Sequence, residues 1–114
     1  MRILHITFTF GYGGIETMLV NIANAQKKMG HDVAIIVIED VVAQELVDRL
    51  HSGIRVYYAH RKQKKDLMAL GRVNYFVWKE NPDAIHLHSS TAYRLLLCPK
   101  YKRIANSTLH AMPN

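Results

Sequence analysis

Residues 3–14 read Ile-Leu-His-Ile-Thr-Phe-Thr-Phe-Gly-Tyr-Gly-Gly, and this stretch decides the expected fold. The apolar run 3–8 is followed closely by a turn that contains three glycines, and residues 15–29 then repeat apolar side chains at helical spacing. A buried strand that leads through a glycine turn into a helix is typical of a parallel sheet covered by helices. The opening of the chain therefore predicts an α/β protein.

The rest of the chain continues this alternation. Further strands are expected at about 33–38, 54–58, 84–87 and 103–109, separated by helices at about 40–50, 64–79 and 91–101. The run 33–38 is almost wholly β-branched, as expected of a strand that is buried on both faces. Right-handed crossovers favour a Rossmann-like, doubly wound sheet of five strands in the order 3-2-1-4-5. Its ligand crevice would lie between the first and fourth strands.

Length and composition favour one soluble domain over residues 1–114, because 49% hydrophobic residues supply a single core. The apolar run at the N-terminus is too short for a signal peptide, and no run is long enough to span a membrane. A cytoplasmic location is therefore expected. The single cysteine, Cys98, cannot form an internal disulfide and is predicted to be buried in the helix 91–101.

Positive charge is concentrated in the second half of the chain. Residues 1–54 hold four basic and six acidic side chains, whereas residues 55–114 hold eleven basic and three acidic side chains. This asymmetry predicts a surface that meets phosphates or anionic lipids, and no nucleic-acid recognition motif accompanies it. The densest run opens the helix 64–79, and a solvated helix start is the alternative to a membrane-facing surface. The candidate membrane-facing residues are Arg61, Lys62, Lys64 and Lys65.

The glycine turn is the strongest local signal for a ligand. Backbone N–H groups at Gly13 and Gly14 can approach a phosphate closely, and the following helix offers its positive N-terminus. No Lys-Ser or Lys-Thr follows, so the turn is not a P-loop, and Glu16 stands where a dinucleotide fingerprint has its third glycine. Acidic residues 39–40, after the second strand, keep an NAD(P)-type protein open as an alternative. A tight turn without any ligand is the other alternative.

Histidines mark the ends of two later strands. His86 and His88 are two residues apart and point to the same face of the sheet. Such a pair can contribute to a zinc site, but no third ligand is evident in the linear sequence, so no metal is predicted. We expect His88 to line the crevice and His86 to be satisfied within the sheet. His110, after the last strand, is expected near the same crevice, with an ordinary exposed loop position as the alternative.

Several of these segments together resemble a known family. The segments are 1–8, Gly13-Gly14-Ile15-Glu16-Thr17, Gly30-His31-Asp32-Val33, 82–89 and Thr108-Leu109-His110. In this order they are similar to the N-terminal, acceptor-side domain of GT-B glycosyltransferases of family 4 (group 1). The resemblance implies a retaining enzyme that moves a sugar from a nucleotide sugar to a glycan or lipid-linked acceptor, in bacterial polysaccharide or lipopolysaccharide biosynthesis.

The resemblance also implies roles for individual residues. Gly13 and Gly14 would help to seat the donor diphosphate, and His110 would act beside the transferred sugar as the catalytic candidate. Glu16, His88 and Ser89 would face the acceptor. Neither a metal nor another cofactor is implied, and the basic surface would rest on the inner face of the plasma membrane.

The family's nucleotide-sugar pocket and its paired glutamates lie in a second Rossmann domain. The 114-residue chain is therefore expected to be a truncated part of the enzyme, inactive alone. Two alternatives remain: an NAD(P)-binding Rossmann protein, and a non-enzymatic module that docks to a membrane or a partner through its basic surface.

Overall fold

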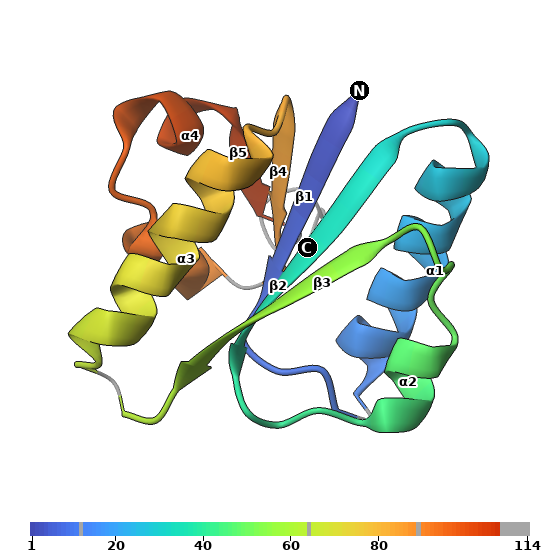
Figure 1. Cartoon of the computed structure of the whole chain (residues 1–114), viewed down its shortest axis with the longest axis horizontal. Helices are drawn as coiled ribbons and strands as arrows, with labels where there is room; N and C mark the ends of the chain where they lie inside the picture. The colour runs from blue at the N-terminus through green and yellow to red at the C-terminus, as the bar shows by residue number, and fades with distance from the viewer. Residues whose placement is uncertain (12, 64, 89, 108–114) are drawn as a thin grey trace, which may run out of the picture.

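The computed structural model describes residues 1–11, 13–63, 65–88 and 90–107, and a parallel sheet forms its centre (Figure 1). The strands lie in the order β3-β2-β1-β4-β5, and every neighbouring pair is parallel. The predicted order is confirmed across the four longer strands. The strands are β1 Arg2–Thr7, β2 Asp32–Glu39, β3 Arg55–Arg61, β4 Ala84–Leu87 and β5 Ala105–Ser107.

Helices cover both faces of the sheet, as the doubly wound prediction requires (Figure 1). On one face lie α1, Gly14–Lys28, and α2, Gln44–Asp48. The opposite face carries α3, Leu67–Glu80, the 3₁₀ helix η1, Ser90–Leu95, and α4, Pro99–Ile104. Among the described residues, no helix has the length and apolar character needed to cross a membrane.

Strand β2 supplies the centre of the core. All of its side chains from Val33 to Ile38 are buried, which confirms the prediction of a strand covered on both faces. Alternate residues serve the two helix layers because successive side chains of a strand point to opposite sides. Val33, Ile35 and Val37 pack with the α1 layer, whereas Ala34, Ile36 and Ile38 pack with the α3 layer.

Several predicted boundaries were wrong. The helix expected at 40–50 begins only at Gln44, because Val42 first forms a parallel bridge with Phe10. The helix expected at 91–101 is divided into η1 and α4, since Pro99 lacks a backbone N–H and forces a new helix start. Cys98 therefore precedes α4 as an exposed N-cap residue and is not part of the core.

The ends of β3 and β5 also differ from the prediction. Strand β3 continues to Arg61, and α3 begins at Leu67, where the Asp66 side chain accepts a hydrogen bond from the N–H of Ala69. The basic run thus belongs to the end of β3 and the loop before α3. Strand β5 is three residues long; positions 108–109 of the predicted strand lie outside the described residues.

Arg55 links β3 to α3 at the edge of the core. Its Nη2 donates to Glu80 Oε1 at 2.6 Å and to Asp32 Oδ1 at 2.7 Å, and its Nε also donates to Glu80. Glu80 is buried, and Tyr57 donates a further hydrogen bond to it. Hydrogen bonding to Arg55 lowers the pKa of Asp32. A buried carboxylate is tolerated here because a guanidinium and a hydroxyl face it.

We expect Arg55→Met to destabilise the fold much more than Arg2→Met. The first change leaves the buried Glu80 carboxylate without its guanidinium partner and should lower the free energy of unfolding by about 2 kcal/mol or more. The second removes an exposed pair with Asp32 and should cost under about 1 kcal/mol. Urea unfolding of both variants measures the difference, and equal losses would show that Glu80 does not depend on Arg55.

Candidate functional site

The candidate site lies where the loops after β1 and β4 leave the same edge of the sheet. The two strands are parallel neighbours, with Ile6 opposite Leu87. The N–H of His88 donates to the carbonyl of Ile6 at 3.0 Å, so the pairing continues one residue beyond β4. The chain departs in opposite directions from these strands, toward β2 on one side and β5 on the other. Doubly wound sheets bind ligands at such a point.

The glycine turn forms the start of α1. Gly13 is the extended N-cap residue, and its carbonyl accepts a hydrogen bond from the N–H of Thr17. The Glu16 carboxylate folds back over it: a Cβ at Gly13 would lie 2.7 Å from Glu16 Oε1. Thr9 Oγ1 also donates to Glu16 Oε2 at 3.4 Å. A carboxylate already occupies the positive end of α1, so a diphosphate bound there would have to displace Glu16.

Three histidines meet on the side of the sheet that α1 covers, where His5 contacts Gln26 in the last turn of that helix. His5 lies in β1 directly opposite His86 in β4. His5 Nδ1 is 3.0 Å from His88 Nε2, and the rings of His86 and His88 are 4.3 Å apart. Ligand nitrogens of all three residues lie within 4.8 Å of one another. The sequence prediction of a His86–His88 pair without a third ligand was therefore incomplete, since His5 supplies one.

The surroundings of the three rings favour their neutral forms. Desolvation lowers the pKa of His5 to about 4, although its hydrogen bond to Gln26 acts in the opposite direction. Desolvation, with smaller contributions from His5 and His86, lowers the pKa of His88 to about 3. Burial also lowers the pKa of His86, which is only partly buried. All three imidazoles are thus uncharged at neutral pH.

Gln26 of α1 sets the direction of the hydrogen bonds through the cluster. Its Oε1 is 2.7 Å from His5 Nε2, so His5 carries its proton on Nε2 and presents a lone pair at Nδ1. His88 then donates from Nε2 to that lone pair. The remaining nitrogen of His88, Nδ1, is buried and has no hydrogen-bond partner among the described residues. The hydrogen-bonded series Gln26–His5–His88 therefore ends at a buried lone pair on His88 Nδ1 that no described donor satisfies, which is energetically unfavourable.

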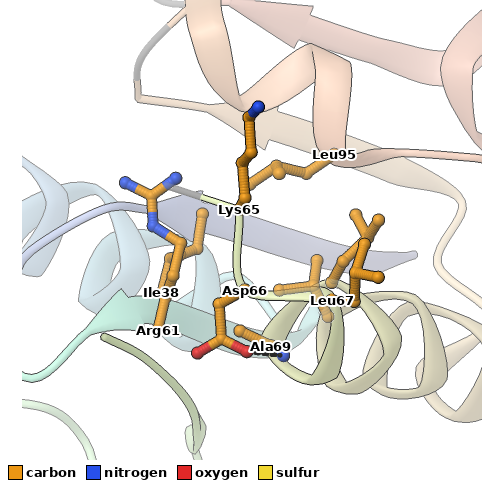
Figure 2. Close-up of a pocket in the computed structure, with 9 residues that line it drawn as sticks. Ile38, Arg61, Lys65, Asp66, Leu67, Ala69 and Leu95 are labelled. Atoms are coloured by element: carbon orange, nitrogen blue, oxygen red, sulfur yellow. Dashed lines mark hydrogen bonds between the residues drawn. The ribbon is translucent and has the colours of Figure 1, made fainter. Parts of the chain in front are cut away.

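A small cavity lies on the other side of the sheet, beside the start of α3 (Figure 2). Its volume of about 70 Å³ is well below the roughly 300–1,000 Å³ of a small-molecule site. Arg61 lines it, donates to Glu39 at 2.9 Å and covers the ring of Phe8. The side chain of Arg61 is only 16% exposed, because it is engaged in these contacts. The prediction that Arg61 faces a membrane is corrected accordingly.

The other predicted site residues divide into two groups. Gly13, Gly14 and Glu16 lie in the turn after β1 and the first turn of α1, and His88 follows β4 with only 3% of its surface exposed; their roles at the site stay predictions. Lys62 and Lys65 are exposed in the loop before α3. Ser89 and His110, with Lys64, fall outside the described residues, and their roles stay predictions.

Comparison with known proteins identifies the family. The model of Glycosyltransferase Family 4 matches residues 12–113, which is nearly the whole chain. The chain belongs to glycosyltransferase family 4. The motif resemblance is confirmed at this level, and the function of this family 4 chain is of the glycosyltransferase type. A search of curated proteins gave no match.

His5 is the residue of this family 4 chain that sequence analysis missed. A signal for it existed: His5 interrupts an otherwise apolar strand, as His86 interrupts the expected fourth strand. What linear spacing could not supply is the register that places the two opposite one another.

We expect the buried histidines to make folding sensitive to mild acid. Unfolded His5 takes up a proton near pH 6.5, whereas folded His5 does so only near pH 4, so the unfolded state binds more protons in between. The free energy of unfolding should therefore fall as pH falls through this window, by about 3 kcal/mol from His5 alone at pH 4. Urea unfolding between pH 7 and pH 4 should show a smaller fall in His5→Gln. His51→Gln, which changes an exposed histidine, should behave as the wild type. If the free energy of unfolding of His5→Gln falls with pH as steeply as that of the wild type, His5 is not the source of the acid sensitivity.

The two glycines at the start of α1 should respond differently to alanine. A Cβ at Gly14 would meet no atom within 4 Å, so Gly14→Ala should raise the free energy of unfolding by about 0.5–1 kcal/mol. A Cβ at Gly13 would collide with Glu16 Oε1, so Gly13→Ala should push the carboxylate away and give no such gain. Thermal unfolding checks both changes, and equal gains would show that Glu16 does not rest on Gly13.

Proposed function

We propose that this chain is the acceptor-side part of a retaining glycosyltransferase that moves a sugar from a nucleotide sugar to a glycan or lipid-linked acceptor. The observation that carries the proposal is the family match over residues 12–113. The geometry supports it, because the glycine turn and His88 directly follow the paired strands β1 and β4, where such sheets bind ligands. The reaction class we propose belongs to bacterial polysaccharide or lipopolysaccharide biosynthesis in the cytoplasm.

In this proposal, each part of the edge has a distinct task. The N–H groups of Gly13 and Gly14 stabilise charge on the leaving diphosphate once Glu16 has moved aside. His88 and Ser89 contact the acceptor, and His110 orients groups beside the transferred sugar. The transfer step itself uses no metal or other cofactor. The donor pocket lies in a second domain, so residues 1–114 alone are inactive.

A binding assay tests the acceptor-side assignment. We expect the 114-residue chain, kept in EDTA, to bind members of a bacterial glycan array and to lose at least about tenfold in affinity in His88→Ala. His51→Ala is the matched control and should bind as the wild type. Failure of every glycan to bind would contradict the acceptor-side role.

A turnover assay tests the proposal that the donor pocket lies in a second domain. The chain is incubated with UDP-, GDP- and ADP-sugars, and released nucleoside diphosphate is measured. No release above background is expected, because the chain is proposed to lack the donor pocket. Turnover by the chain alone would contradict a donor pocket in a second domain. Tight binding of NAD(P), measured in parallel, would instead favour the dinucleotide-binding alternative.

We also propose that the loop before α3 docks on the anionic inner face of the plasma membrane. Lys62 and Lys65 are exposed there. The neighbouring apolar residues Leu67 and Met68 are 77% and 71% exposed. Basic side chains beside apolar ones suit a headgroup region, where the lysines meet lipid phosphates and the apolar side chains enter the acyl boundary. This combination favours docking over a merely solvated loop.

Liposome flotation tests membrane docking. The double variant Lys62→Glu/Lys65→Glu should bind vesicles of anionic phospholipid about 30-fold or more weakly, because each lysine contributes about 1 kcal/mol. The control, Lys28→Glu/Arg49→Glu, makes the same charge change on the α1–α2 side. Equal weakening of both variants would reduce the effect to net charge and would contradict a specific docking surface.

A further inference from the structure

We propose that His5, His86 and His88 form a binding site for a borderline divalent transition-metal ion such as Zn²⁺. The site lies on the α1 side of the sheet and joins β1 to the end of β4. It shares His88 with the acceptor contact proposed above, but it takes no part in the transfer step and does not depend on it. The ion links two neighbouring strands, because its ligands come from β1, from β4 and from the residue that follows β4.

The donor set suits such an ion. Zn²⁺ binds imidazole nitrogens at about 2.0–2.1 Å, so the nitrogens of a tetrahedral site lie about 3.4 Å apart. His5 Nδ1 and His88 Nε2 are already 3.0 Å apart, and ligand atoms of all three rings lie within 4.8 Å. Small side-chain adjustments bring the three nitrogens to one ion. A fourth position remains for water, as in zinc sites with three protein ligands.

The hydrogen bonds of the cluster already present one lone pair to an ion. Metal ligands must be neutral imidazoles, and His5 presents the lone pair of Nδ1 because its Nε2 donates to Gln26 Oε1. His88 ligates through Nε2, so an ion replaces its hydrogen bond to His5 Nδ1, and the ring proton moves to Nδ1, which has no partner among the described residues.

Support and access complete the site. Gln26 Oε1 accepts from His5 Nε2, which leaves Nδ1 as the ligand atom and fixes the ring. A carbonyl behind a ligating histidine is the usual outer partner in metal sites. His86 is partly exposed, so an ion can reach the cluster from solvent. Gln26 is thus a positioning residue, and the three histidines are the ligands.

Titration of the EDTA-treated chain with Co²⁺ tests the proposal, because tetrahedral Co²⁺ absorbs visibly. We expect one equivalent to bind with an intense visible band, Zn²⁺ to displace it, and the melting temperature to rise. His5→Gln, His86→Gln and His88→Gln should each weaken binding at least about 100-fold, and Gln26→Leu by about tenfold. His51→Gln and His60→Gln, which change exposed histidines, should bind as the wild type.

Three outcomes would overturn the proposal. They are a wild-type chain that gives no tetrahedral Co²⁺ band, binding that survives in all three ligand variants, and binding that His60→Gln abolishes. The last would show an adventitious surface ion at His60 and Asp40, whose side chains are 2.6 Å apart. Circular dichroism reports whether each variant folds. If a substitution at the buried His5 or His88 prevents folding, the titration of the wild type and of His86→Gln, at a partly exposed residue, still tests the proposal. Glycan binding in EDTA is measured separately, so the two proposals fail independently.

Discussion

The pairing of β1 with both β2 and β4 is the constraint on which the rest of the structure depends. β1 lies at the centre of the sheet, and its register with each neighbour is continuous. Because side chains alternate along a strand, Leu4 and Ile6 join the core on the α3 side while His5 faces α1 and Gln26. The same register sets His5 opposite His86. The centre of the sheet therefore carries a polar cluster as well as a hydrophobic core.

Two buried polar groups are accommodated in opposite ways. The histidine cluster stays neutral, and Gln26 orders its hydrogen bonds from α1. Glu80 is a buried carboxylate that Arg55 and Tyr57 contact from β3. In each case a polar side chain of a strand is joined to a helix, so desolvation is offset by a contact that also fixes how that helix packs. One contact ties β1 to α1, and the other ties β3 to α3.

The β1–β4 edge brings together features with different roles in this family 4 chain. The glycine turn presents the N-terminus of α1, but Glu16 occupies it and must move before an anion binds there. The histidine cluster joins β1 to the end of β4, and Nδ1 of His88 has no hydrogen-bond partner among the described residues. An ion at the cluster would link the two strands, whereas the acceptor is proposed to meet His88 and Ser89. The two proposals share His88 and differ in chemistry.

The sequence alone determined the α/β class, the burial of β2 and the positions of most elements. These properties follow from local periodicity and from the conformational freedom of glycine. It also sufficed for the family, because the motifs recur in order along the chain. Tertiary structure decided the division of the expected fourth helix at Pro99, the engagement of Arg61 with Glu39, and the third histidine. Such features depend on contacts between residues far apart in the chain. Register across the sheet, rather than spacing along the sequence, determines that His5 and His86 meet.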